Sequence, residues 1–475
     1  MPAADLQAPT AHASFRDPAG TLYRFPNRIL RAVHPSAVQD LEDFLSTTTA
    51  QTFMSERRLV SSRKLSPLEH PQLDADDVWE HERIPFPIFA YEWPAEMLHA
   101  AGALTLDLAE AALEEGFGLK DATPYNVLFR GLHPIFIDVL SFERPDPLDA
   151  TWMPYGQFVR TFLLPLMASR HFGLPLDRTL SGQRDGIEPE MMYRWAGFWQ
   201  RLTPPFLGLV TLPKWLRGKE SSEPSYRRPL ASSSEKARFV MKGLLDSCRR
   251  QLNRLAPRVE RDSTWSGYMD HKSLYSESQR AQKEAFVQEA LDLARPADVL
   301  DVGANEGHFS FMAARTGASV VAIDYDPVVA GSIWRNALRE NLDVLPMVVD
   351  LTRPTPAMGW RNEENASFLD RARGKFDLVM MLAVVHHILV NERIPLLELL
   401  TLADELSRDY VLIEYVAPAD PIFQRIVRGR DALYSHMSPA WFEAEALSRF
   451  ELVRCTRIDG LNRWLYLFRR RRDTN

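Results

Sequence analysis

The chain has 475 residues, which is enough for two or three domains, and 56 Lys and Arg against 63 Asp and Glu give a formal charge of −7. This mild acidity argues against a general nucleic-acid coat or a binder of anionic membranes. The only two cysteines are Cys248 and Cys455. They exclude a disulfide framework and a four-sulfur zinc site, and we expect no metal centre.

Targeting and membrane-spanning patterns are missing from the sequence. No basic start is followed by an apolar run, and no stretch reaches the roughly 18 apolar residues of a membrane span. The closest candidates, Phe162–Met167 and Phe206–Leu212, are short and contain or adjoin prolines, so we interpret them as buried or groove-lining segments. We expect a cytoplasmic protein without membrane or nucleic-acid partners.

The first half of the sequence begins with an Ala- and Pro-rich stretch, which predicts a loose arm over residues 1–20. A domain is expected over residues 21–212. In it, a broad apolar face predicts a helix from Pro94 until Gly116 stops it. Val127–Phe129 and Pro134–Leu140, separated by a turn, then predict two strands.

Residues 213–262 are rich in serine and basic residues and are interpreted as a connector with a surface helix around 235–255. Charge runs of this kind usually face solvent. The alternative is a positively charged surface that faces an anionic substrate.

From residue 263 to residue 475, apolar strands alternate with helices, beginning with a helix at Glu277–Ala294. This alternation predicts a parallel α/β sheet, and a final pair of strands around Asp459–Gly460 predicts an antiparallel hairpin. The expected strands are Val299–Val302, Ser319–Ile323, Val344–Val349, Phe376–Leu382, Tyr410–Tyr415, Phe450–Cys455 and Arg463–Phe468.

The strongest pattern is VLDVGANEGHFS at Val299–Ser310, where a strand ends, the chain turns at two glycines, and a helix begins. About twenty residues later the next strand ends in Asp324 and Asp326, where a carboxylate can hold ribose hydroxyls. Asp301 precedes the turn and would repel a pyrophosphate, so the pattern favours an adenosine-type ligand that carries positive charge. The alternative is a tightly packed strand–helix turn without a ligand.

These motifs resemble those of class I S-adenosylmethionine-dependent methyltransferases, in order, across roughly residues 265–470. The resemblance implies a Rossmann-like sheet of seven strands, and S-adenosylmethionine as cofactor. One departure is Asn305, where many members have a glycine, although Asn tolerates the left-handed conformation. The cofactor-binding residues implied by the resemblance are Asp301, Gly303, Asn305, Gly307, Asp324, Asp350 and Leu351.

Methyl transfer to an OH or NH acceptor can use a general base, and histidine is the natural choice. His386 and His387 follow the fourth strand of the sheet, and Glu414 ends the fifth. Each is a candidate catalytic residue, and each has a structural alternative: the histidines could pack the sheet edge and the carboxylate could cap a helix. Tyr434 and His436 are weaker candidates for the acceptor pocket.

The N-terminal segment LKDATPYNVLFRGLHPIFID resembles the catalytic core of the protein-kinase-like superfamily. Asp121 and Asn126 have the D-x-x-x-x-N spacing, and Asp138 has the place of the metal-binding aspartate. No glycine-rich loop exists before residue 100, where Gly20 is the one glycine. The resemblance therefore implies a degenerate α+β kinase-like domain, with a live kinase or an unrelated fold as alternatives.

Together these features predict a methyltransferase that acts on an oxygen or nitrogen of a small-molecule acceptor, with the N-terminal domain as an acceptor-recognition scaffold. One rival hypothesis is a bifunctional phosphotransferase–methyltransferase. The other is a non-catalytic sensor that binds S-adenosylmethionine.

Overall fold

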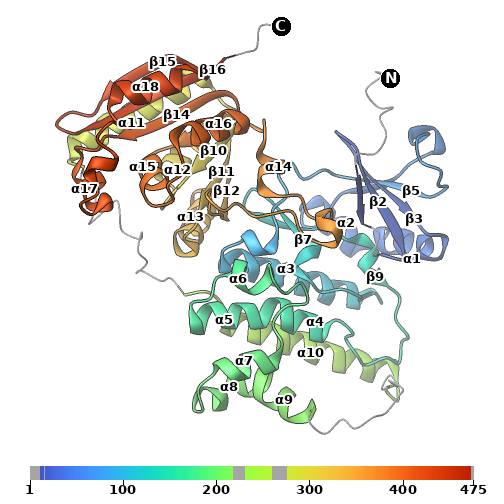
Figure 1. Ribbon diagram of the computed structural model, residues 1–475. Coiled ribbons are helices and arrows are strands. Elements are labelled where there is room, and N and C mark those ends of the chain that lie inside the picture. Colours follow the sequence, from blue (N-terminus) through green and yellow to red (C-terminus); the bar gives the residue numbers. More distant parts are fainter. Residues whose placement is uncertain (1–10, 15–16, 218–229, 259–274, 472–475) are drawn as a thin grey trace. The chain divides into compact units, whose positions relative to one another are not determined.

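The computed structural model describes residues 11–14, 17–217, 230–258 and 275–471. The chain divides into two compact units, Met1–Arg258 and Val259–Asn475 (Figure 1). The predicted boundary at residue 263 lies outside the described residues. Within the described ranges, no helix is long and apolar enough to cross a bilayer.

The first unit opens with a five-stranded antiparallel sheet in the order β1-β2-β3-β5-β4. The strands are β1 (Ala11–Ser14), β2 (Gly20–Arg24), β3 (Ile29–Val33), β4 (Ser62–Lys64) and β5 (Val78–His81). The predicted loose arm is wrong for residues 11–14, because β1 pairs with β2 through backbone hydrogen bonds. Helices α1 (Pro35–Leu45) and α2 (Thr48–Ser55) connect β3 to β4.

The centre of the first unit is α3 (Ala95–Glu114), which buries eleven of its twenty residues and agrees with the predicted helix. Gly116, at a φ of 81°, turns the chain just after it. A hairpin of β7 (Val127–Arg130) and β8 (His133–Phe136) follows. The second predicted strand is too long, because Val139–Ser141 form a 3-10 turn. The short strands β6 (Gly118–Leu119) and β9 (Phe142–Glu143) flank this hairpin in the sequence and pair with each other.

The rest of the first unit is helical. Its helices are α4 (Tyr155–Phe158), α5 (Leu164–Phe172), α6 (Leu176–Leu180), α7 (Pro189–Trp195), α8 (Pro204–Phe206), α9 (Leu212–Arg217) and α10 (Ser234–Arg254). The predicted surface helix is α10, but it is not part of a connector. Its Leu252 packs against Gly102 of α3, and its Arg249 pairs with Asp107 and Glu110 at 2.7 and 2.8 Å.

The second unit contains the predicted seven-stranded mixed sheet, in the order β12-β11-β10-β13-β14-β16-β15. The strands are β10 (Asp298–Val302), β11 (Ser319–Asp324), β12 (Val344–Val348), β13 (Phe376–Met381), β14 (Ser407–Val416), β15 (Phe450–Arg457) and β16 (Arg463–Arg470). The first five are parallel, and β16 pairs antiparallel with both β14 and β15. The continuous apolar runs of the central strands are buried, as strands covered on both faces require.

Helices connect these strands (Figure 1). They are α11 (Glu277–Ala294), α12 (His308–Arg315), α13 (Pro327–Glu340), α14 (Phe368–Ala372), α15 (Val385–Val390), α16 (Leu396–Leu406), α17 (Pro421–Val427) and α18 (Pro439–Leu447). A capping box between Ser276 and Gln279 starts α11 at the predicted position. Since the parallel strands all point the same way, the loops after β10, β11, β12 and β13 meet at one edge of the sheet.

Candidate active site

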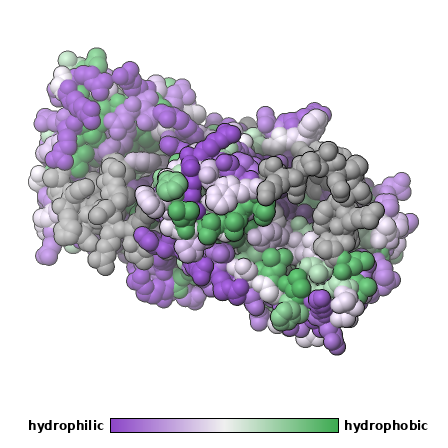
Figure 2. Space-filling model, turned by 90° about the horizontal axis from the view of Figure 1, so that it is seen from below, coloured by the Kyte–Doolittle hydropathy of each residue, from purple (hydrophilic) through white to green (hydrophobic). Residues whose placement is uncertain are grey.

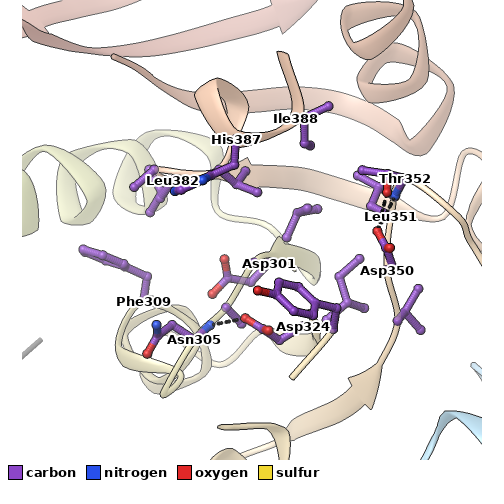
Figure 3. Close-up of a pocket in the computed structure, with 18 of the residues that line it drawn as sticks. Asp301, Asn305, Phe309, Asp324, Asp350, Leu351, Thr352, Leu382, His387 and Ile388 are labelled. Atoms are coloured by element: carbon purple, nitrogen blue, oxygen red, sulfur yellow. Dashed lines mark hydrogen bonds between the residues drawn. The ribbon is translucent and has the colours of Figure 1, made fainter. Parts of the chain in front are cut away.

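A cavity of about 380 Å³ lies at the carboxyl ends of β10, β11, β12 and β13 (Figure 3). Open parallel sheets bind ligands at this edge. Of the predicted site residues, the cavity brings together Asp301, Gly303, Asn305, Asp324, Asp350, Leu351 and His387. Gly307, His386 and Glu414 do not line it.

The glycine turn after β10 depends on left-handed backbone conformations. Gly303, Asn305 and Gly307 have φ angles of 69°, 51° and 84°, so Asn305 adopts the conformation that its side chain tolerates. A Cβ atom on Gly303 would lie 3.1 Å from the side chain of Val384, and one on Gly307 would lie 3.0 Å from Ile333. Both positions therefore favour glycine because of their positive φ angles and their close packing within the protein.

Asp301 and Asp324 are two buried carboxylates at the floor of the cavity. Asp301 accepts a hydrogen bond from the Ser310 hydroxyl at 2.6 Å. Asp324 accepts backbone hydrogen bonds from Asn305 and Asp326, each at 2.9 Å. Burial raises the pKa of Asp301 and that of Asp324 to about 6. Two carboxylates that are costly to ionise alone make this site suited to a ligand that carries positive charge.

Asp350 and Leu351 follow β12 and lie on the cavity wall beside Thr352 (Figure 3). The Asp350 carboxylate accepts hydrogen bonds from the Thr352 backbone at 2.9 Å and from its hydroxyl at 2.6 Å. Both bonds end on the same carboxylate oxygen and hold the loop in place. The wall therefore offers one fixed acceptor next to an apolar side chain, a pattern that suits a base edge and ring.

His387 lies across the cavity from Asn305 and Asp324, on α15 (Figure 3). Its Nδ1 is 3.4 Å from the side-chain nitrogen of Asn391. Burial lowers the pKa of His387 to about 4, so the imidazole is neutral at physiological pH. A neutral imidazole can accept a proton, but this one is a weaker base than the near-neutral histidine that the sequence suggested.

His386 is turned away from the cavity and is 1% exposed. Its ring centre lies 4.3 Å from that of His387, and neither ring nitrogen has a hydrogen-bond partner among the described residues. Burial first, and then nearby positive charges, lower the pKa of His386 well below its ordinary value. Its contact with the His387 ring makes it a packing neighbour of that residue.

Glu414 at the end of β14 is fully buried in an ion network. Its carboxylate pairs with Lys283 of α11 at 2.6 Å, lies 3.7 Å from Arg463 of β16, and accepts the hydroxyl of Tyr275. Burial opposes ionisation, but Lys283 and Arg463 hold the pKa of Glu414 below its ordinary value. A carboxylate held ionised by three donors is a poor proton acceptor.

The two weaker candidates also lie apart from this cavity. Tyr434 is buried in a small apolar cluster with Phe423 and Val427. The ring of His436 meets the ring of Trp441 edge to face at 5.4 Å. Both residues line a second hollow beside Leu389 and Arg393, and neither lines the cavity that contains His387.

Sequence reasoning missed several residues that line the cavity. Lys283 and Phe309 lie at one end of it, where the Lys283 ammonium is 4.8 Å from the centre of the Phe309 ring. Tyr325 follows Asp324 directly and is 57% exposed. An aromatic residue immediately after the ribose-type carboxylate was visible in the sequence. No pattern indicated that α11 would bring Lys283 to the site.

The second unit matches a known protein family. A family model described as a methyltransferase domain matches residues 275–471, which are all of the described residues of the second unit. That unit has the mixed seven-stranded sheet and the glycine turn with its following carboxylates. The second unit is therefore a class I S-adenosylmethionine-dependent methyltransferase domain, and the donor set at the cavity fits this cofactor.

Particular relatives extend the comparison. The chain is 27% identical over 460 residues to the nodulation protein NoeA of Rhizobium meliloti (strain 1021), covering 96% of this chain and 95% of NoeA. Among solved structures, N-methyltransferase NodS of Bradyrhizobium japonicum WM9 is 12% identical and covers 42% of this chain and 99% of its own, with a TM-score of 0.32. WbdD is 19% identical and covers 44% of this chain and 43% of its own, with a TM-score of 0.30. The two structural scores are too low to carry a conclusion.

Proposed function

We propose that this chain methylates an oxygen or nitrogen atom of a small molecule or modified natural product, with S-adenosylmethionine held at the edge of the second unit's sheet. The observation that supports this proposal is the cavity that joins Asp301, Asp324 and Asp350 to His387. The cofactor supplies an electrophilic methyl group on a sulfonium. The carboxylates would hold the groups of the cofactor that donate hydrogen bonds or carry positive charge.

The protein's own contribution in this proposal is mainly positioning. Asp324 is fixed by two backbone amides, and its remaining lone pairs would receive the ribose hydroxyls. Asp350 and Leu351 would hold the adenine. Asp301, buried beside Ser310, would attract the cationic part of the ligand. His387, which lies across the cavity from these carboxylates, would take a proton from the acceptor.

The first unit is proposed to recognise the acceptor. The similarity to NoeA runs through both units and not through the methyltransferase domain alone, which supports a shared task for the two units. Asp121, Asn126 and Asp138 form one network there, in which the Asn126 amide donates to the Asp121 carbonyl at 3.2 Å and to Ser141 at 3.3 Å. Ser141 in turn donates to Asp138 at 2.5 Å. The arrangement supports a kinase-like scaffold.

Phosphate transfer by this scaffold is the weaker candidate, because Asp138 already has a cationic partner. In protein kinases the third strand carries a lysine for the phosphates, and the aspartate after the hairpin holds magnesium. Here the third strand, β3, carries Arg31, whose guanidinium pairs with Asp138 at 2.8 Å. Burial opposes ionisation, yet Arg31 and Ser141 keep the pKa of Asp138 below its ordinary value. The carboxylate of Asp138, which a magnesium ion would need as a ligand, is thus already paired with Arg31.

Two experiments separate the hypotheses. Metabolite profiles of a deletion strain and its parent would reveal the acceptor, and the purified chain with labelled S-adenosylmethionine should then methylate it. Cofactor binding without any turnover on that acceptor would favour the sensor. Incubation with magnesium, ATP and the acceptor should yield no ADP, and Asp121→Asn should leave methylation chemistry intact. ADP production that Asp121→Asn abolishes would establish the bifunctional rival.

A further inference from the structure

An aromatic, apolar surface covers one end of the first unit. It is formed by α7, the segment after it and α9, and its large apolar side chains are between 41% and 79% exposed. We call this set the apolar patch: Trp195, Phe198, Trp199, Leu202, Leu212, Trp215 and Leu216. Figure 2 views the molecule from the end that carries α7, α8 and α9, and shows hydrophobic side chains gathered on this face. Folded monomers rarely expose so large a patch without a partner.

Contacts around Tyr193 connect the parts of the patch. Arg201 and Lys214 both lie over the ring of Tyr193 on α7, with their charged groups 3.9 and 3.7 Å from the ring centre. Arg201 also donates to the Tyr193 carbonyl at 3.0 Å, and its own carbonyl accepts the Thr211 hydroxyl at 2.9 Å. These contacts join α7 to α9. The rings of Phe198 and Trp199 meet edge to face at 5.2 Å between them.

The charge of this region is mostly positive. Residues 189–217, from the start of α7 to the end of α9, contain four basic residues, Arg194, Arg201, Lys214 and Arg217, and one acidic residue, Glu190, although the whole chain has a net charge of −7. The expectation of no membrane partner was based on that whole-chain charge. Tryptophan prefers the boundary between lipid headgroups and acyl chains, and neighbouring cations are attracted by anionic headgroups.

We propose that the apolar patch docks this chain peripherally on an anionic lipid surface. Its Trp, Phe and Leu side chains enter the headgroup boundary, and Arg194, Arg201 and Lys214 pair with lipid phosphates. Lipid is favoured over a protein partner because three tryptophans and three leucines are exposed on a segment that carries four basic residues against a single acidic one. A large apolar side and a basic rim are the features of interfacial binding. This proposal is independent of the acceptor and of the methyl-transfer chemistry.

The test uses the full chain and vesicles of phosphatidylcholine, either alone or mixed with phosphatidylglycerol. The chain should co-sediment with the anionic vesicles, less with the neutral ones, and less as salt is raised. The double variant F198S/W199S should lower the partition coefficient at least about tenfold. Charge reversal in R194E/K214E should lower it about fivefold for each cation removed, on anionic vesicles only.

The matched control is L68S/W360S, which removes two exposed apolar side chains outside the patch, 87% and 60% exposed. It should bind vesicles like the parent chain. Since Phe198 and Trp199 are exposed, F198S/W199S should keep the parent's circular dichroism and its affinity for S-adenosylhomocysteine. The proposal is overturned if the parent does not bind anionic vesicles or if the control loses binding equally. It is also overturned if sedimentation shows self-association that F198S/W199S abolishes, because a second copy would then cover the patch.

Discussion

Asp301 offers the sharpest test of the site, because its charge should help ligand binding and harm folding. The carboxylate is 2% exposed, and burial raises its pKa from 3.8 to about 6. A shift of about two units corresponds to about 3 kcal/mol, at about 1.4 kcal/mol per unit, lost from the folded state when the group is ionised. Asp301→Asn keeps the shape and can still accept the Ser310 hydroxyl. We therefore expect the ligand-free variant to gain about 1–3 kcal/mol in free energy of unfolding at neutral pH.

The stability difference between Asp301→Asn and the parent should depend on pH. Above about pH 6 the folded parent carries the full cost of the buried charge. As the pH falls through 6 toward 4, the folded state takes up a proton before the unfolded state does, and the cost fades. The advantage of Asp301→Asn should therefore shrink across this window. Its affinity for S-adenosylmethionine should fall about 10- to 100-fold, since the attraction for a cationic ligand is lost.

The assay is urea unfolding at several pH values together with calorimetry of ligand binding. Asp343→Asn is a matched control, because Asp343 is exposed and also accepts a serine hydroxyl, that of Ser319. It should change stability by less than about 0.5 kcal/mol at every pH. A variant Asp301→Asn that is less stable than the parent at neutral pH, with ligand affinity unchanged, would refute the reasoning on both counts.

Three further predictions concern the same cavity. Asp301 and Asp324 each have a pKa of about 6, so affinity for S-adenosylhomocysteine should fall as the pH is lowered below 6. The fall should be up to about tenfold per pH unit for each carboxylate that must be ionised to bind the ligand. A calorimetric affinity that does not change with pH would contradict this. Gly303→Ala should lower the free energy of unfolding by about 1–3 kcal/mol, because position 303 has a φ of 69° and a new Cβ atom would press against Val384. The double variant that also carries Val384→Ala should recover only part of this loss, as measured by thermal unfolding. His387→Gln should lower kcat about 100-fold and leave cofactor affinity unchanged. In the parent, kcat should persist down to about pH 4, because burial lowers the pKa of His387 to about 4. A fall in the parent's kcat centred near pH 6.5 would contradict the role proposed for this buried imidazole.

The sequence predicted the second unit well because its information is local. A parallel strand buried on both faces has to be apolar throughout, so β10 to β14 can be recognised one at a time. The glycine turn and Asp324 stand at fixed distances after strand ends, and parallel strands bring those ends to one edge. The glycine turn and the carboxylate at this edge could therefore be predicted from spacing, whereas Asp350 and Leu351 were implied only by the resemblance to methyltransferases.

The first unit was harder to predict because its decisive contacts join distant parts of the chain. Arg31 pairs with Asp138 across 107 residues, and α10 docks on α3 through Arg249, more than 130 residues away. A basic, polar helix looks like a solvated one until its partners are known. For the same reason, residues 11–14 looked like an arm, since a short strand at a sheet edge has little pattern of its own.

Glu414 shows why a residue's place at a strand end does not define its role. The sheet edge suggested a catalytic base, but a buried carboxylate is stable only when its charge is matched. Lys283 from α11 and Arg463 from β16 supply that match, and Arg463 is held in turn by Asp420 at 2.8 Å. The network ties α11 to the sheet and thereby fixes Lys283 at the edge of the cofactor cavity. Loss of one partner would leave the other charges buried and unpaired, so Glu414 has a structural task in this network, and the proton-transfer role that we propose for His387 does not depend on it.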